Sequence, residues 1–195
     1  MSEILFIRHA ETDMSGTFCG HSDPPLNSRG MAQASDLVRG LQSECIHNVY
    51  TSDLSRAYQT AMILASSFKA DCHSRPALRE INFGQWEGLT WSAIQQIHLR
   101  YSQCWIDQYP NLPAPDGERF SDFKKRALDE IALLVRSLGG RSIAVVTHAG
   151  VLRLVLCHLL ETSEEQSWQL TSSYCSIVRY QPPMQMLSQS EEKAS

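Results

Sequence analysis

Two short segments of this sequence are apolar at every position, and they constrain the fold more than any other feature. They are residues 4–7 near the start and residues 143–146 near the end. A run without polar residues at alternate positions is typical of a strand that is buried on both faces of a parallel sheet. Segments with apolar residues at helical spacing lie between the two runs. We therefore predict an α/β fold, a three-layer α/β/α sandwich around a mostly parallel central sheet.

The other elements follow from the same periodicities and from turn residues. A loop rich in Gly, Ser, Asp and Pro covers residues 13–27. Asp53 is positioned to cap the second helix, and Gly139 stops the longest helical pattern. The other predicted strands cover residues 46–51 and 174–180, and a short strand is expected within 71–78. Two helices are predicted to begin at Ser28 and just after Asp53. Three more are predicted over residues 90–109, 118–138 and 151–160.

Composition narrows the class of protein without indicating a function. A chain of 195 residues with 43% hydrophobic content can bury one core, which predicts a single domain over residues 1–183. The net charge of −4 provides no basic surface for nucleic acid, so a phosphate site needs a few converging cations. The tail at residues 184–195 is rich in Ser, Gln, Glu and Lys and is expected to be disordered.

The cysteines and the chain start predict a cellular setting. The six cysteines include no pair at the C-x-x-C spacing of zinc and redox motifs. The first residues do not resemble a signal peptide, and no segment is long enough to span a bilayer. We expect a reduced, cytoplasmic protein without a membrane or nucleic-acid partner, and its oligomeric state stays open.

Cationic side chains follow three of the predicted strands. Arg8 and His9 come after the first strand, Arg56 lies shortly after the second, and His148 follows the apolar run at residues 143–146. Ligands of open α/β sheets bind beyond the carboxyl ends of the strands, where these side chains would meet. Each residue taken singly is more often a surface or structural residue. Together, two arginines and two histidines predict an anion pocket, and the planar guanidinium suits phosphate.

Five motifs resemble those of the histidine phosphatase (phosphoglycerate mutase-like) superfamily, and they occur in the same order. They are residues 5–12 (LFIRHAET), 20–27 (GHSDPPLN), 52–61 (SDLSRAYQTA), 79–88 (REINFGQWEG) and 146–150 (VTHAG). Five motifs in order are a much more specific signal than any one of them. The resemblance implies a phosphoglycerate mutase-like fold and a phosphatase that acts on small phosphate esters without a metal ion or a cofactor.

The resemblance also implies a role for each site residue. His9 attacks phosphorus and becomes phosphohistidine, which requires a neutral imidazole whose second nitrogen donates a hydrogen bond. Arg8, Arg56 and His148 hold the oxygens of the phosphate and balance their charge. Glu80 is the general acid, which protonates the leaving oxygen and then deprotonates the water that releases phosphate.

Two other carboxylates compete for the acid role. Glu11 is next to the nucleophile in sequence, but we expect it to order its loop. Glu87 follows a tryptophan and is expected to support the site from behind. We favour Glu80 over both because of the family match.

Three positions depart from the family pattern. Ala10 stands where glycine usually follows the nucleophile, so its methyl group either crowds the loop or requires a φ that alanine tolerates. Ser15 stands where an asparagine often binds phosphate, and its side chain is a shorter donor. A second alanine, Ala149, follows the second histidine. We retain Ser15 and Ala149 as substrate-binding candidates.

The segment from Trp105 to Phe120 resembles the lid of bacterial α-ribazole-5′-phosphate phosphatases, which act late in the assembly of the cobalamin nucleotide loop. We therefore expect a helical lid insertion around residues 89–120 and α-ribazole 5′-phosphate as the substrate. A lid with tryptophans would suit the dimethylbenzimidazole ring. The alternatives are a sugar-phosphate or broad-specificity phosphatase, a phosphoglycerate mutase, for which the chain is short, and a non-catalytic phosphate-binding relative. A nucleotide-binding protein lacks support, because the sequence has no Gly-rich phosphate loop.

The remaining polar candidates have structural interpretations. Arg153 could face the pocket, but a charge on the helix surface is the expectation that we adopt. The other histidines share no metal-ligand spacing and are expected at surface or structural positions: His21, His47, His73, His98 and His158.

Overall fold

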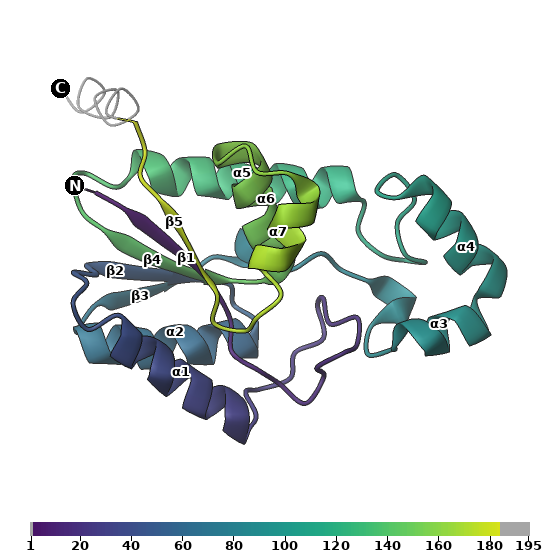
Figure 1. Ribbon diagram of the computed structural model, residues 1–195, viewed down its shortest axis with the longest axis horizontal. Helices are drawn as coiled ribbons and strands as arrows, with labels where there is room; N and C mark the ends of the chain where they lie inside the picture. The colour runs from purple at the N-terminus through teal and green to yellow at the C-terminus, as the bar shows by residue number, and fades with distance from the viewer. Residues whose placement is uncertain (1, 184–195) are drawn as a thin grey trace.

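The structure is a computed structural model that describes residues 2–183. Its strands are β1 (Ile4–Arg8), β2 (Asn48–Thr51), β3 (Asp71–Ser74), β4 (Ile143–Thr147) and β5 (Ile177–Tyr180). They form one sheet in the order β3-β2-β4-β1-β5 (Figure 1). The first four strands run parallel to one another, and β5 runs antiparallel to β1. The prediction of a mostly parallel α/β sheet is confirmed.

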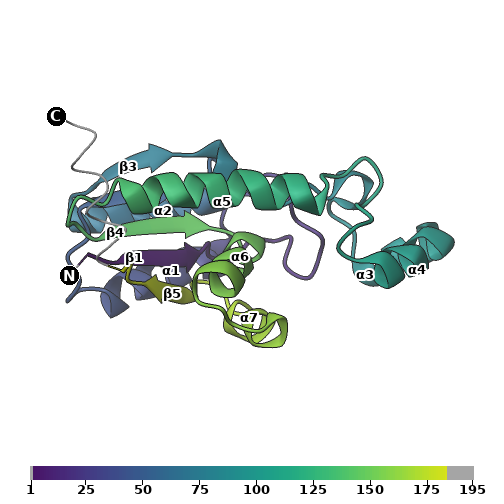
Figure 2. The ribbon, with the colours of Figure 1, turned by 90° about the horizontal axis from the view of Figure 1, so that it is seen from above.

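Helices cover both faces of this sheet and extend beyond one end. They are α1 (Ser28–Gly40), α2 (Ser55–Phe68), α3 (Trp91–Ile97), α4 (Leu99–Gln108), α5 (Phe120–Arg136), α6 (Ala149–Leu159) and α7 (Glu164–Leu170). α1 and α2 pack on one face, and α5 and α6 pack on the other (Figure 1). α3 and α4 project past the end of the sheet (Figure 2), and α7 packs beside α6. Within residues 2–183, no helix has the length and apolarity needed to cross a membrane.

The central strand β1 is buried on both faces, as its unbroken apolar run predicts. Ile4 and Phe6 belong to the core under α5 and α6, whereas Leu5 and Ile7 belong to the core under α1 and α2. Every residue of β4 is buried as well. Each large apolar side chain buried in this way stabilises the fold by about 1.5–3 kcal/mol. This burial holds β1 and β4 at the centre of the sheet.

The pairing of β1 with β4 joins two segments that are far apart in the sequence. Arg8 lies opposite Thr147 in the parallel register. The backbone N–H of His9 donates to the carbonyl of Thr147 at 2.9 Å, and His148 follows directly. The two histidines therefore leave the sheet side by side at its carboxyl end, where ligands of such sheets bind.

The start of α2 differs from the prediction. Asp53 does not cap this helix, because its carboxylate accepts hydrogen bonds from Nε of Arg79, at 2.6 Å, and from Nη2. Asp23 of the preceding loop takes the capping role, since its carboxylate accepts the backbone N–H and the hydroxyl of Ser55. A carboxylate at this position satisfies N–H groups that have no partner within the helix.

Four other segments also differ from the prediction. Residues 90–109 form two helices that meet at His98, and α5 is slightly shorter than expected at both ends. The predicted strand over residues 174–180 begins later, because Cys175 has a left-handed φ of 56°. α7 has no counterpart in the prediction, since its short and mostly polar sequence lacks a helical apolar pattern. The disorder predicted for residues 184–195 falls outside the described residues.

Candidate active site

The carboxyl ends of β1 and β4 bring His9 and His148 together in a buried position. Their ring centroids are 5.1 Å apart, and only 7% of His9 and 1% of His148 are exposed. Arg56, in the first turn of α2, is fully buried beside them, and Arg8 is the last residue of β1. The structure thus brings together the two histidines and two arginines that the sequence singles out.

The hydrogen bonds of His9 define its tautomer. Nδ1 lies 2.7 Å from the carbonyl oxygen of Ala10, which can only accept, so Nδ1 carries the proton. Nε2 therefore keeps a lone pair, and it accepts a hydrogen bond from Nε of Arg56 at 3.2 Å. Burial, followed by the charge of Arg56, holds the pKa of His9 well below its usual value. The result is a neutral imidazole with one available nitrogen, which is the state that a nucleophile requires.

Backbone carbonyls of the loop before α1 hold Arg56 in place. Its Nη1 donates to the carbonyl of Ser22 at 2.7 Å. Its Nη2 donates to the carbonyls of Gly20 at 2.8 Å and Cys19 at 3.1 Å. Carbonyl oxygens carry no net charge, so they orient the guanidinium without pairing it with a negative charge.

Glu87 organises the loop that holds Arg56. Its carboxylate accepts four backbone N–H groups at 2.7–3.0 Å, those of Gly20, His21, Ser22 and Phe83. Burial by itself raises the pKa of Glu87, but these hydrogen bonds outweigh that effect and lower the pKa overall. A carboxylate engaged in this way supports the site from behind, which agrees with the expectation for Glu87.

The carboxylate of Glu80 lies at the amino-terminal end of α6. Its Oε2 accepts the backbone N–H of Gly150 at 2.9 Å, and its Oε1 accepts that of Ile81 at 2.9 Å. The residue is only 8% exposed. A Cβ at position 150 would lie 2.1 Å from Oε1, so glycine is the residue that leaves room for this carboxylate. The predicted acid is thus fixed by two backbone N–H groups.

Three buried nitrogen atoms of the site have no hydrogen-bond partner among the described residues. They are Nε of Arg8 and both ring nitrogens of His148. The rest of Arg8 is anchored, because Nη1 donates to the carbonyls of Thr171 at 2.9 Å and Ser172 at 2.7 Å. Burial, followed by neighbouring charges, holds the pKa of His148 well below its usual value. Since an unsatisfied buried polar group costs about 1–3 kcal/mol, these atoms indicate a pocket for a polar ligand.

The other candidates lie at the margin of this cluster. Ala149 is the half-buried first residue of α6, and Ser15 is exposed in a turn, where its side chain makes no hydrogen bond within residues 2–183. Glu11 orders the start of α1 by accepting hydrogen bonds from Asn27 and Gln33. In the described part of the chain, no group of three or more His, Cys, Asp or Glu side chains is arranged to hold a metal ion.

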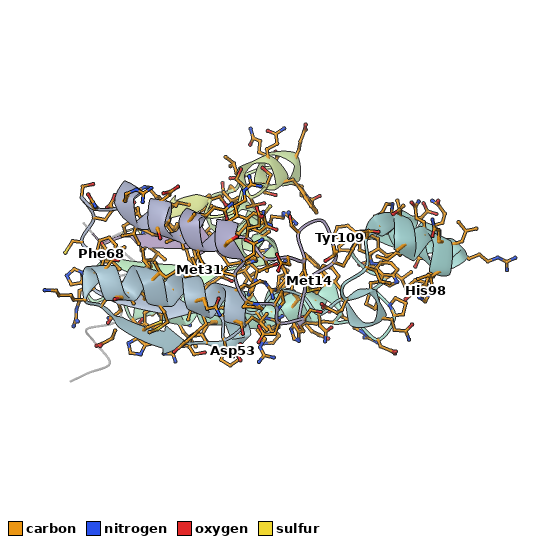
Figure 3. The ribbon with its side chains drawn as sticks, turned by 90° about the horizontal axis from the view of Figure 1, so that it is seen from below. Met14, Met31, Asp53, Phe68, His98 and Tyr109 are labelled. Atoms are coloured by element: carbon orange, nitrogen blue, oxygen red, sulfur yellow. The ribbon has the colours of Figure 1, made fainter. Side chains whose placement is uncertain are left out.

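A cavity of about 690 Å³ opens beside Glu80 and is lined by Glu80 and Gly150. Residues of the α3–α4 segment line one part of it, and residues of α6 and α7 line another. Figure 3 shows Tyr109 on the side of α4 nearer to the sheet, whereas His98 lies farther out. The aromatic side chains that line the cavity include Phe18, Phe83, Trp91, Trp105, Tyr109 and Trp168.

Arg153 also lines this cavity, so the expectation of a helix-surface charge is wrong. The side chain is half-buried, and its Nε donates to the hydroxyl of Thr171 at 3.1 Å. Its guanidinium carbon lies 3.3 Å from the ring centre of Trp168. The sequence could not reveal this environment, because it depends on how α7 and the residues that follow it pack against α6.

Two further residues contact the predicted site. Thr60 links two of its parts, since its hydroxyl accepts the N–H of Ala10 at 3.1 Å and donates to the carbonyl of Arg56 at 2.7 Å. The ring centre of Tyr174 lies 4.3 Å from the guanidinium of Arg8. The spacing of four residues after Arg56 is a signal for Thr60, because such residues share a helix face. No local pattern points to Tyr174.

Known proteins share both the sequence features and the fold. A model of the histidine phosphatase superfamily (branch 1) matches residues 4–185. The chain is 32% identical to the adenosylcobalamin/α-ribazole phosphatase of Escherichia coli K12 over 167 aligned residues. The alignment covers 85% of this chain and 82% of that protein. The chain is 30% identical to the metal-independent phosphoserine phosphatase of Arabidopsis thaliana, over 84% of this chain and 71% of that protein. The crystal structure of the α-ribazole phosphatase from Shigella flexneri superposes on this structure with a TM-score of 0.85 at 28% sequence identity. The superposition covers 95% of this chain and 92% of that one.

Proposed function

The chain belongs to the histidine phosphatase superfamily, and we propose that it hydrolyses phosphomonoesters through a phosphohistidine on His9, without a metal ion. One observation carries this proposal. His9 is a buried imidazole with its proton on Nδ1, and its Nε2 faces the guanidinium of Arg56. Such an imidazole can attack phosphorus without first losing a proton.

In this proposal, the phosphate binds between Arg8, Arg56 and His148. The unpartnered nitrogens of Arg8 and His148 receive its oxygens. The Nε–H of Arg56 shifts from Nε2 of His9 to a phosphate oxygen, which uncovers the attacking lone pair only when substrate is present. The negative charge of the phosphate raises the pKa of His148, since an opposite charge favours the protonated form, and this supplies a further donor.

Two steps then complete the reaction. His9 Nε2 forms a bond to phosphorus as the bond to the ester oxygen breaks, and Glu80 gives its proton to the departing oxygen. Glu80 next takes a proton from a water molecule, which attacks the phosphohistidine. The bond from phosphorus to nitrogen breaks, inorganic phosphate leaves, and the electron pair returns to Nε2. The fixed cations stabilise the charge on the transferring group in both steps.

We propose α-ribazole 5′-phosphate as the substrate, in the assembly of the cobalamin nucleotide loop. The relatives named as α-ribazole phosphatases support this assignment. The cavity supports it as well, because Trp91, Trp105 and Tyr109 could pack against a flat benzimidazole ring. In this proposal the segment over residues 89–120 acts as a lid. All six cysteines are free thiols, which suits the reduced cytoplasm as the location.

A second candidate function is that of a sugar-phosphate or broad-specificity phosphatase. The relative named as a metal-independent phosphoserine phosphatase favours a small polar substrate of this kind. The two candidates share the chemistry at His9 and differ only in what occupies the cavity.

The test is phosphate release by the purified protein in the presence of EDTA. The substrates are α-ribazole 5′-phosphate, several sugar phosphates, 3-phosphoglycerate, phosphoserine and p-nitrophenyl phosphate, and the variant is His9→Ala. We expect preference for α-ribazole 5′-phosphate and no activity in the variant, while His47→Ala, which changes an exposed histidine, retains full activity. Similar rates on all substrates would support the second candidate. Activity that survives His9→Ala or is lost with EDTA would overturn the proposed mechanism.

A further inference from the structure

Arg153 presents an ordered guanidinium to the cavity, and the proposed reaction does not use it. Its Nε donates to the hydroxyl of Thr171 at 3.1 Å, and its flat face lies against Trp168 with 3.3 Å between guanidinium carbon and ring centre. Its two terminal nitrogens have no partner within residues 2–183. An arginine that is held by its inner nitrogen and one face keeps a free fork, which matches two adjacent acceptor oxygens.

Thr171 ties this guanidinium to the phosphate pocket. The residue is fully buried, and its hydroxyl also donates to the carbonyl of Ser167 at 2.8 Å. Its own carbonyl accepts Nη1 of Arg8 at 2.9 Å. Arg8 and Arg153 are thus anchored on the carbonyl and the hydroxyl of one fully buried residue, which fixes these two anchor points relative to each other.

Arg153 also lines the cavity next to the proposed acid. Glu80, Gly150 and Arg153 line the same cavity. Burial lowers the pKa of Arg153, and the charge of Glu80 acts on it in the opposite direction, which is a sign of their proximity. A leaving group that takes its proton from Glu80 therefore enters the space that Arg153 faces.

We infer that Arg153 is a specificity residue that binds a pair of adjacent oxygen atoms on the leaving part of the substrate. The inference rests on the proposed function, because phosphate bound next to His9 determines which part of a ligand reaches Arg153. Two groups offer this chemistry, the neighbouring hydroxyls of a ribose and the carboxylate of a phosphorylated hydroxy acid or amino acid.

Two matched pairs of phosphate esters distinguish these sources. Ribose 5-phosphate and 2-deoxyribose 5-phosphate differ in one of the two hydroxyls, and phosphoserine and phosphoethanolamine differ in the carboxylate. The measurements are kcat/KM for the native chain and for Arg153→Met. Dissociation constants for the same four ligands are measured by calorimetry on His9→Ala, with and without Arg153→Met, so that the answer does not depend on turnover.

For at least one pair, we expect the native chain to prefer the member with both oxygens by roughly tenfold or more, as for hydrogen bonds to a charged group. Arg153→Met should reduce that preference to within about twofold. The kcat/KM and the dissociation constant for the member that lacks one of the oxygens should stay nearly unchanged. The pair that responds identifies the source of the oxygens. Arg153→Lys keeps the charge but not the fork and should lose most of the preference.

The matched control is Lys124→Met, which removes another half-buried cation from the lining of the cavity. It should leave the preference intact. The inference is overturned if neither pair shows a preference, if the preference survives Arg153→Met, or if all four ligands weaken equally, as a purely structural role would require. A chain that binds the pairs selectively but releases no phosphate would refute the proposed function and retain the role of Arg153.

Discussion

Gly150 and Glu80 fit together without space for even one additional carbon atom. The backbone N–H of Gly150 donates to Oε2 at 2.9 Å, while a Cβ on the same residue would lie 2.1 Å from Oε1. The position of the proposed acid is therefore determined by the backbone of the first turn of α6. This contact allows the contribution of Glu80 to be tested without replacing Glu80 itself.

Gly150→Ala should displace the carboxylate of Glu80 and lower kcat on an alkyl phosphate by about 10²-fold, the usual contribution of a general acid. The loss on p-nitrophenyl phosphate should be smaller, because its leaving group departs with little need for a proton. Helix propensity favours alanine by about 1 kcal/mol, which offsets part of the cost of displacing the buried carboxylate. Steady-state kinetics on both substrates and urea unfolding measure these effects. An equal loss on both substrates would mean that Gly150 does not act through Glu80.

Glu87→Ala should weaken phosphate binding, although Glu87 does not contact the phosphate in the proposed mechanism. The variant removes the acceptor for four backbone N–H groups of the loop that orients Arg56. We expect inorganic phosphate to inhibit the variant about tenfold more weakly and the free energy of unfolding to fall by about 2–4 kcal/mol. The control is Asp129→Asn, which breaks an exposed surface ion pair with Lys125 and should leave stability nearly unchanged. Unchanged inhibition in Glu87→Ala would argue against this support of Arg56.

The buried histidines make stability depend on pH in a defined direction. The pKa values of His9 and His148 are held well below 6.5 in the folded protein, mainly by burial. Between those lowered values and about 6.5, the unfolded chain binds protons that the folded chain does not, so stability falls as pH decreases through this range. Each histidine contributes a slope of up to about 1.4 kcal/mol per pH unit.

Urea unfolding between pH 7.5 and 5.5 measures that slope. His148→Asn should make it shallower, whereas His47→Asn, at an exposed position, should leave it unchanged. If His148→Asn shows the same slope as the native chain, burial of His148 is not the source of the pH dependence.

Ala10→Gly restores the residue that is usual in the family, and it should destabilise this protein. Ala10 is fully buried, packs with Leu26 and Ala34, and does not have a positive φ. Loss of the methyl contact and greater freedom of the unfolded chain together predict a cost of roughly 1–2 kcal/mol. Thermal or urea unfolding measures the cost, and we expect little change in kcat. A clear rise in kcat would indicate instead that the methyl group crowds the nucleophile loop.

The central sheet and the cluster of two histidines and two arginines could be predicted because their signals are local. An apolar run such as residues 4–7 forms a buried strand in almost any α/β arrangement, and parallel pairing then brings Arg8 and His9 next to His148. Glu80 could be identified only through the family motif, because no pattern near it indicates the N–H groups of Gly150 and Ile81 that fix it.

The predictions for Arg153 and Asp53 are wrong for a shared physical reason. A charged residue on a helix faces solvent unless another segment covers it, and α7 covers Arg153 although its own sequence is short and polar. Asp53 has the sequence position of a helix cap, but the guanidinium of Arg79 takes its carboxylate. Both outcomes depend on partners that are distant in sequence.

The cavity beside Glu80 is bordered by the α3–α4 segment and by α6 and α7, while the proposed reacting groups come mainly from the edge of the sheet. Substitutions in the cavity walls can therefore change which molecule is accepted without altering His9 or its neighbours. This separation gives such a protein considerable room for evolutionary divergence, because a gene duplicate can acquire a new substrate by drift in the walls while the inherited chemistry stays intact.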